Sequence, residues 1–323
     1  MLQLSVLEYG WVNTKLVDCP VCNNFKYPSS LSYEIKDYLN RDPKQCFRYI
    51  SCHCGVFYLR NQPVNEDIHL IYSNKYEAYR ISKSLVSLLK QKRMSSLVKP
   101  LLSKERETRI LDYGCGSGEF LYAISSLAET TLIGYDINAP SGKSDEHVTF
   151  TSDESIVKSL APFDLIFSFQ VIEHLPDPFQ FLKFLYSLLN NEGTVIIETP
   201  SSSGLLFLKS LRMRWGGWHA PRHFVIFQES SLSELCIKAG FEVISIQYIP
   251  SPFQWIETIR TFFPSNSIFQ KSLSLDNFFL VSITYFIDVL AAKMGFKTSN
   301  MKFVLKKINS RSKEVSDRNP REF

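Results

Sequence analysis

Short apolar runs, separated by polar turns and helix-like segments, recur between residues 110 and 305 and predict a sheet. Phe163–Phe169 is apolar almost throughout, as is typical of a central parallel strand covered on both faces. The predicted strands are Ile110–Leu111 with its neighbours, Thr130–Tyr135, Val148–Thr151, Phe163–Phe169, Thr194–Glu198, Phe241–Ile249 and Met301–Leu305. The predicted helices are Glu119–Ala128, Phe179–Leu189 and Gln228–Ala239, with a turn at Asn190–Gly193. This order predicts an α/β fold with a doubly wound, seven-stranded sheet.

Two further segments carry apolar patterns outside these strands. Tyr76–Leu102 places Leu85, Leu88 and Leu89 at helical spacing with lysines between them, which predicts an amphipathic helix beside the first strand. The insertion at 250–300 is rich in Phe and Ile, and its apolar part is shorter than the roughly 20 residues that cross a bilayer. It is either a membrane helix in the plane of the interface or a partner surface, or a buried helical hairpin that caps a pocket.

Composition and charge narrow the partners only slightly. The chain has 323 residues, 45% of them hydrophobic, and a formal net charge of +4, so it can bury a full core and neither requires nor excludes an acidic partner. The N-terminal segment lacks the pattern of a secretory signal, and seven cysteines, an odd number, are typical of reduced thiols. The expected location is the cytoplasm, or the inner face of the membrane if the insertion lies in the bilayer plane.

A glycine turn follows the first predicted strand. Asp112 precedes Gly114, Gly116 and Gly118, and such a turn lets a ligand lie against the main chain where the next helix begins. A dinucleotide fingerprint would need a third glycine at position 119. Glu119 stands there, and its carboxylate would oppose a pyrophosphate, so the pattern predicts a ligand that presents no phosphate to the turn.

Asp136 closes the second predicted strand, about 20 residues beyond the glycines, where an acid can accept from both ribose hydroxyls. The turn resembles motif I of the class I S-adenosylmethionine-dependent methyltransferases, D/E-x-G-x-G-x-G. The resemblance implies a Rossmann-like methyltransferase sheet and S-adenosylmethionine as cofactor. It also implies that Asp153 meets the adenine amino group, although the residues equally favour a helix N-cap there. The expected cofactor-binding residues are Asp112, Gly114, Cys115, Gly116, Gly118, Asp136, Ile137, Asp153 and Gln170.

Two later runs extend the resemblance. E-H-L-x-D-P at 173–178 resembles the segment after the fourth strand in the ubiquinone-type, methyltransferase-23-like group, and P-R-H-F at 221–224 resembles a run that borders its acceptor site. The catalytic residues implied are His174, His223 and Glu173, with His219 as a third histidine. Arg222 is expected to hold an anionic group of the substrate. For any single histidine, a structural hydrogen-bonding role is the alternative. Paired glycines beside Trp215 and Trp218 predict a mobile flap with an aromatic face at 201–225.

Five of the seven cysteines lie between positions 19 and 54. Two knuckles on short hairpins are the layout of a zinc ribbon, in which four thiolates hold one tetrahedral ion. The expected Zn²⁺ ligands are Cys19, Cys22, Cys52 and Cys54, with His53 or Cys46 able to substitute. The alternative is a small β module with reduced, metal-free cysteines. The pattern resembles the ribbon that precedes many bacterial class I methyltransferases of polysaccharide and sugar-modifying gene sets.

These expectations divide the chain into four parts: a zinc-ribbon-like module at 1–62, a linker and amphipathic helix at 63–106, a methyltransferase domain at 107–308 and a flexible tail at 309–323. The expected activity is methylation of a hydroxyl of a sugar, a lipid-linked saccharide or a quinone-like small molecule. A nucleic-acid acceptor is disfavoured because the ribbon region has only scattered basic residues. The alternative function is a non-catalytic S-adenosylmethionine-binding or scaffold protein that holds partners through the ribbon and the insertion.

Overall fold

The computed structural model describes residues 12–23, 31–37, 45–72, 85–103, 105–127, 129–140, 148–204, 211–263 and 273–308, apart from the side chain of Lys90. The predicted tail at 309–323 and the first part of the predicted helix, residues 76–84, lie outside the described residues.

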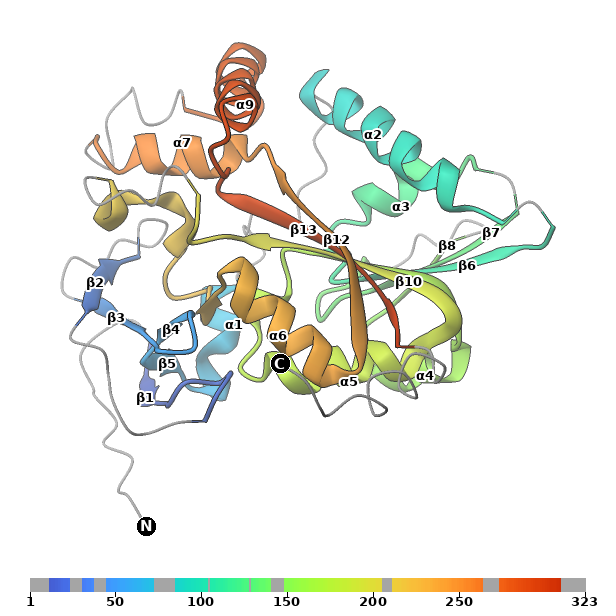
Figure 1. Cartoon of the computed structure of the whole chain (residues 1–323), viewed down its shortest axis with the longest axis horizontal. Coiled ribbons are helices and arrows are strands. Elements are labelled where there is room, and N and C mark those ends of the chain that lie inside the picture. Colours follow the sequence, from blue (N-terminus) through green and yellow to red (C-terminus); the bar gives the residue numbers. More distant parts are fainter. Residues whose placement is uncertain are drawn as a thin grey trace, which may run out of the picture.

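A mixed sheet of seven strands crosses the centre of the molecule in the order β12-β13-β10-β9-β6-β7-β8 (Figure 1). The strands are β6 (Thr108–Tyr113), β7 (Thr130–Tyr135), β8 (Val148–Thr151), β9 (Phe163–Phe169), β10 (Leu189–Pro200), β12 (Phe241–Ile249) and β13 (Asn300–Lys307). The pairs from β10 to β8 are parallel, whereas β13 is antiparallel to both β10 and β12. The doubly wound, seven-stranded sheet is therefore confirmed. The strand order reverses between β6 and β9, and ligands of such sheets bind beyond the carboxyl ends of the strands at that point.

Helices cover both faces of the sheet. Figure 1 shows α2 and α3 on one side and α4, α5 and α6 on the other. The helices are α1 (Ile68–Ile71), α2 (Leu85–Val98), α3 (Glu119–Ile124), α4 (Glu154–Leu160), α5 (Pro178–Leu188), α6 (Glu229–Ala239), α7 (Pro252–Arg260) and α9 (Phe278–Lys293). Ile166 and Phe167 point to opposite faces of β9 and are both fully buried, which explains why this strand is apolar almost throughout.

The N-terminal residues form two small sheets. One pairs β1 (Thr14–Leu16) with β5 (Asn61–Pro63), and the other has the order β11-β4-β3-β2. Its strands are β2 (Ser32–Lys36), β3 (Cys46–Ser51), β4 (Phe57–Leu59) and β11 (Val225–Ile226). Because β11 comes from the far side of the chain and pairs with β4, the N-terminal module and the large sheet are joined by main-chain hydrogen bonds. The predicted four-part division of the chain stays a prediction.

Several local expectations need correction. Residues 61–67 are not a linker without structure, since they form β5 and a 3-10 turn at Asn65–Asp67. The helix after the glycine turn ends at Ile124, four residues earlier than expected. The turn expected at Asn190–Gly193 lies inside β10, where a change of register absorbs the extra residues.

The segment with paired glycines is packed into the molecule. Trp215 and Trp218 are both buried, and the Trp218 ring lies 4.7 Å from the ring of Tyr49 and 5.4 Å from that of Tyr33. The aromatic face that the sequence predicted here therefore faces the N-terminal module.

The two amphipathic expectations are wrong in the face that the helix buries. In α2, Ser87 and Val98 are buried, whereas Leu85, Leu88 and Leu89 are exposed. In α9, Thr284, Asp288 and Ala291 are buried and most apolar side chains are exposed, so the alternative of a buried hairpin is contradicted. Among the described residues, no helix is long and apolar enough to cross a membrane.

Candidate cofactor and acceptor site

The glycine turn joins β6 to α3 at the carboxyl edge of the sheet. The N–H groups of Gly114 and Cys115 donate to the carbonyl oxygen of Tyr135, at 2.7 and 2.9 Å. The N–H of Gly116 donates to Asp136 Oδ2 at 3.0 Å. The turn after β6 and the acid after β7 are therefore in direct contact, as a site that seats a nucleoside on both would require.

Asp136 is held in one orientation by main-chain donors. Asn138 N–H donates to its Oδ1 at 2.9 Å, while Gly116 N–H occupies its Oδ2. A carboxylate oxygen has two lone pairs, so each oxygen can accept one further hydrogen bond. Ile137, which follows, is 59% exposed and can lie against a flat base. These residues fit a nucleoside ligand whose ribose hydroxyls meet Asp136.

Close packing explains the glycine at two positions of the turn. Gly114 has φ +86°, and a Cβ there would lie 2.3 Å from Val171 Cγ2. Gly118 has φ +76°, and a Cβ there would lie 2.5 Å from the ring of Phe150. The turn is thus held against the segments that follow β9 and β8, which brings the ends of three neighbouring strands together.

Substituting Gly114 by Ala should destabilise the protein by about 2 to 4 kcal/mol, because a left-handed backbone and a clash with a β-branched side chain add together. Gly295→Ala is the matched control, since Gly295 has φ +84° but no atom within 4 Å of its Cβ position. That variant should lose only about 1 to 2 kcal/mol. Urea unfolding would measure both, and equal losses would show that the contact with Val171 has no energetic weight.

The remaining predicted cofactor residues lie around this edge in different roles. Asp112 and Cys115 are buried within the turn. Gln170 follows β9 with φ +57°, a conformation that is unfavourable for a side-chain-bearing residue and concentrates at functional sites. Its amide donates to Asn300 Oδ1 at 3.1 Å. Asp153 is exposed and accepts from Ser155 N–H at 2.7 Å as the N-cap of α4. The capping alternative is therefore realised, and its contact with adenine stays a prediction.

Three histidines gather just beyond β9. His174 ends the 3-10 turn at Ile172–His174, and its ring lies 4.7 Å from that of His223, which in turn lies 4.9 Å from that of His219. The main chain ties the two segments together, because Phe224 N–H donates to the carbonyl oxygen of Glu173 at 2.7 Å. The sequence predicted these residues for catalysis, and the structure brings them together.

Hydrogen bonds define the tautomer of two of these rings. His174 Nδ1 lies 2.9 Å from the carbonyl oxygen of Arg222, and His223 Nδ1 lies 2.8 Å from that of Gly217. Because a carbonyl oxygen can only accept, we assign the proton to Nδ1 in both rings, which leaves each Nε2 as an acceptor. Tyr72 Oη also contacts His174 Nδ1, at 2.9 Å. Burial lowers the pKa of His174 to about 4 and that of His223 well below its usual range, so both rings are neutral near pH 7.

Glu173 is fully buried beside the histidines. Thr199 Oγ1 donates to its Oε2 at 2.9 Å, and Oε1 has no hydrogen-bond partner among the described residues. Burial raises the pKa of this carboxyl to about 8. A proton or a divalent cation would satisfy Oε1, and ligand atoms of Glu173, His174 and His223 do lie within 4.8 Å of one another. A carboxyl in this position orients its neighbours and does not reach solvent.

Glu173 should make stability depend on pH in a defined direction. Its pKa rises from 4.5 to about 8 on folding, so between these values the folded state holds a proton that the unfolded chain does not. The stabilisation is complete below about pH 4.5 and is lost as the pH rises through about 8. Glu173→Gln mimics the protonated group, so the variant should gain about 3 to 5 kcal/mol over the natural protein between about pH 5 and pH 8. Thermal unfolding across this range would measure the difference, and a constant difference would refute the assignment. Glu242→Gln, on an exposed residue, is the control.

Some residues of this site could not be found from local sequence. Arg222, expected to hold a substrate anion, is buried and donates to both carboxylate oxygens of Asp37 at 3.2 and 3.3 Å. That expectation is wrong, since the guanidinium is committed to the N-terminal module. Tyr49 Oη donates to the carbonyl oxygens of Trp218 and His223 at 2.9 and 2.7 Å. Nothing near Asp37 or Tyr49 in the sequence signals partners more than 150 residues away.

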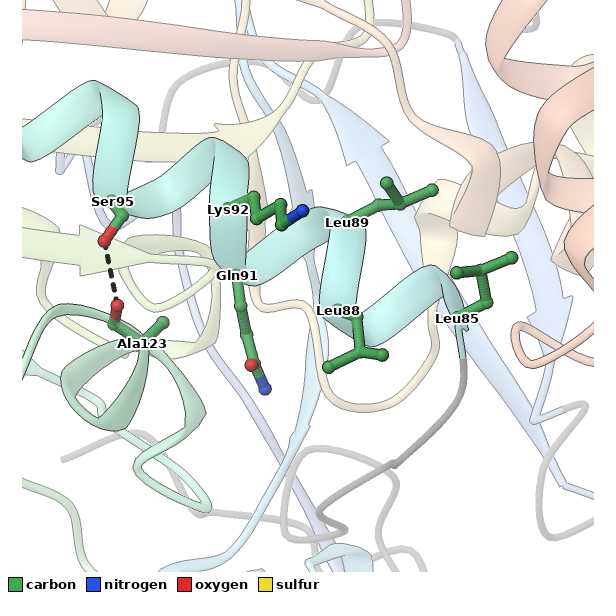
Figure 2. A pocket seen from close by; sticks show the side chains of 7 residues that line it. All are labelled: Leu85, Leu88, Leu89, Gln91, Lys92, Ser95 and Ala123. Carbon is green, nitrogen blue, oxygen red and sulfur yellow. Dashed lines mark hydrogen bonds between the residues drawn. The ribbon is translucent and has the colours of Figure 1, made fainter.

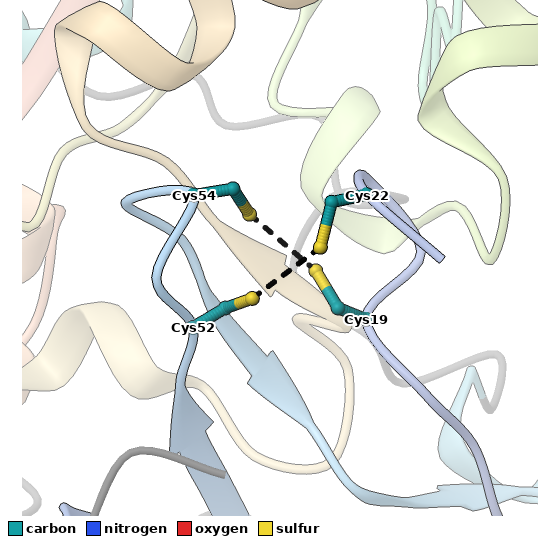
Figure 3. Close-up of side chains that lie close together, drawn as sticks. All are labelled: Cys19, Cys22, Cys52 and Cys54. Atoms are coloured by element: carbon teal, nitrogen blue, oxygen red, sulfur yellow. Dashed lines mark hydrogen bonds between the residues drawn. The ribbon is translucent and has the colours of Figure 1, made fainter. Parts of the chain in front are cut away.

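The four cysteines of the two knuckles converge at one point (Figure 3). The sulfurs of Cys19 and Cys54 are 3.6 Å apart, and those of Cys22 and Cys52 are 3.5 Å apart. All four lie within 4.8 Å of one another, and none forms a disulfide. Four sulfurs bound tetrahedrally at the usual Zn–S length of about 2.3 Å would be roughly 3.8 Å apart. The donor set and its spacing therefore fit one zinc ion. Cys46 lies outside this cluster.

Comparison with known sequences identifies one segment. Residues 88–246 match the profile of a family described as a methyltransferase domain. The chain is 29% identical over 180 residues to a tRNA U34 carboxymethyltransferase of Sulfurimonas denitrificans, covering 47% of this chain and 57% of that protein. It is 27% identical over 164 residues to a ubiquinone biosynthesis O-methyltransferase of Ruegeria pomeroyi, covering 46% and 65%. The matches thus span less than two thirds of either relative.

Among solved structures, the chain is similar to an S-adenosylmethionine-dependent methyltransferase from Archaeoglobus fulgidus. The sequence identity is 22% and the TM-score is 0.45, with 75% of this chain and 100% of that chain covered.

Proposed function

We propose that this chain, which contains a methyltransferase domain over residues 88–246, transfers a methyl group from S-adenosylmethionine to a hydroxyl group of a sugar, a lipid-linked saccharide or a quinone-like small molecule. The observation that carries the proposal is the contact between the glycine turn and Asp136, through the hydrogen bond from Gly116. It provides one place where a nucleoside can meet main chain and carboxylate at the switch point of the sheet.

The hydroxyl class of acceptor rests on the neutral histidines. Bound S-adenosylmethionine would supply an electrophilic methyl group, and a hydroxyl that accepts it must lose a proton. The Nε2 atoms of His174 and His223 are unprotonated acceptors in our assignment and can take that proton. A positioned base of this kind contributes about 10²- to 10⁴-fold to the rate. The ubiquinone biosynthesis O-methyltransferase among the relatives supports oxygen as the methylated atom.

The same proposal includes one Zn²⁺ ion held by Cys19, Cys22, Cys52 and Cys54. The ion is structural, because four protein ligands leave no open position for a substrate. It would fix the two knuckles against β4, the strand that pairs with β11 just after His223. The ribbon would thereby position the acceptor side of the site.

Two measurements test the activity. Calorimetry with zinc-loaded protein should show binding of S-adenosylmethionine, and transfer of radiolabelled methyl groups should then be followed into separate fractions of cell glycans, lipids, quinones and tRNA. Label in a hydroxyl-bearing glycan, lipid or quinone supports the proposal. Label in tRNA would overturn the acceptor class, and binding without transfer to any fraction would favour the scaffold alternative.

A further inference from the structure

Helix α9 presents its apolar side to solvent. The residues it buries are Thr284, Asp288 and Ala291, two of them polar. Phe279 is 77% exposed, Phe286 65% and Ile283 59%. Monomeric proteins rarely expose a contiguous apolar surface of this kind unless something binds there.

Helix α2 has the same inversion and contacts α9. Figure 2 shows its outward leucines, Leu85, Leu88 and Leu89, beside a hollow of about 400 Å³. A hydrogen bond from Ser95 Oγ to the carbonyl oxygen of Ala123, at 2.9 Å, fixes the opposite face of α2 on α3. In Figure 1, α2, α7 and α9 all lie along one side of the molecule. The exposed apolar residues of α2 and α9 are called the outer apolar surface below.

Positive charge surrounds the outer apolar surface. The Arg93 guanidinium lies 5.8 Å from the centre of the Tyr285 ring, and Lys293 at the end of α9 is exposed. Over residues 85–98 and 276–297 the cations are Lys90, Lys92, Arg93, Lys293 and Lys297, and the acids are Asp276 and Asp288. Asp288 faces inward, where it accepts from Ser251 N–H and Trp255 Nε1 at 2.6 and 2.8 Å.

We propose that the outer apolar surface docks the protein on a bilayer containing anionic phospholipids, with α9 lying in the plane of the interface. The apolar side chains of α9 and α2 enter the boundary between headgroups and acyl chains, while Lys92, Arg93 and Lys293 meet the phosphates. Helix α9 has 16 residues, too few to span the bilayer, which agrees with an in-plane position.

The charges favour a lipid surface over a second copy of this chain. A symmetric dimer through this surface would place the same cationic residues opposite one another, which costs binding energy. An anionic headgroup layer instead complements them. The formal charge of the whole chain, +4, adds to the attraction.

Flotation of the full-length, zinc-loaded protein with vesicles tests the proposal. The protein should float with vesicles of phosphatidylglycerol and phosphatidylcholine, much less with phosphatidylcholine alone, and the binding should weaken with added salt. The double variant Ile283→Ser with Phe286→Ser should bind at least about tenfold more weakly. Lys92→Gln with Arg93→Gln should reduce binding to the anionic vesicles by roughly tenfold or more.

Ile237→Ser is the matched control, because Ile237 is also an exposed isoleucine, 55% exposed, but lies on α6 across the sheet. It should bind vesicles normally. Unchanged binding by the α9 variant, equal binding to neutral vesicles, or a dimer in gel filtration that Ile283→Ser converts to a monomer would each overturn the proposal. Binding of S-adenosylmethionine by the α9 variant should be unchanged, so this test stands apart from that of the activity.

Discussion

Replacing Asp136 by alanine is expected to weaken binding of S-adenosylmethionine by roughly 100- to 1,000-fold. Two hydrogen bonds from ribose hydroxyls to a buried carboxylate are each worth about 1.5 to 3 kcal/mol, and both are lost together. The variant also removes the acceptor of the Gly116 N–H, so part of the loss comes from the glycine turn itself. Calorimetry on folded, zinc-loaded protein measures the dissociation constant.

Asp136→Asn separates the two contributions, because its carbonyl oxygen can still accept from Gly116 N–H while the negative charge is gone. We expect an intermediate affinity for this variant. Glu242→Ala is the control for loss of a negative charge, since Glu242 lies on β12 at the opposite edge of the sheet. An Asp136→Ala protein that binds as tightly as the natural one would place the ribose elsewhere.

The second large effect is expected from Cys22→Ser. Three remaining thiolates should lose Zn²⁺ on dialysis, so the metal content should fall from about one ion per chain to near zero. The variant should also unfold at a much lower temperature, because structural zinc contributes about 10 to 16 kcal/mol in isolated zinc-finger peptides. Elemental analysis and thermal unfolding measure the two quantities.

Cys46→Ser is the matched control in the same module, since Cys46 lies in β3 outside the cluster. It should keep its metal and most of its stability. A natural protein purified without chelator that contains no zinc would refute the metal site, and equal stability of the two variants would show that the ribbon folds without it.

Local patterns predicted the parts of the fold that short-range physics determines. The run Phe163–Phe169 is apolar because β9 is buried on both faces, and the run of glycines predicted the turn after β6. The convergence of four cysteines followed from their number and spacing. In each case the signal lies within a few residues of the feature it predicts.

The rest depended on contacts between distant segments. The salt bridge from Arg222 to Asp37 and the pairing of β11 with β4 join the two ends of the chain, and neither residue pair is recognisable before the chain is folded. The face that α2 buries could not be read from its leucines, because Ser87 and Ser95 are held by contacts with α3. Periodicity shows that a helix has an apolar side, and only the surroundings decide whether that side is covered by protein.

The pairing of β4 with β11 has a consequence for synthesis of the protein. The small sheet of the N-terminal module receives its last strand from Val225–Ile226, more than 160 residues after β4 leaves the ribosome. Until then one edge of β4 presents unpaired main-chain groups, which are open to pairing with other chains. A nascent chain must therefore complete most of the large sheet before its first module is closed, and chains that stop before residue 225 should aggregate rather than accumulate as a folded ribbon.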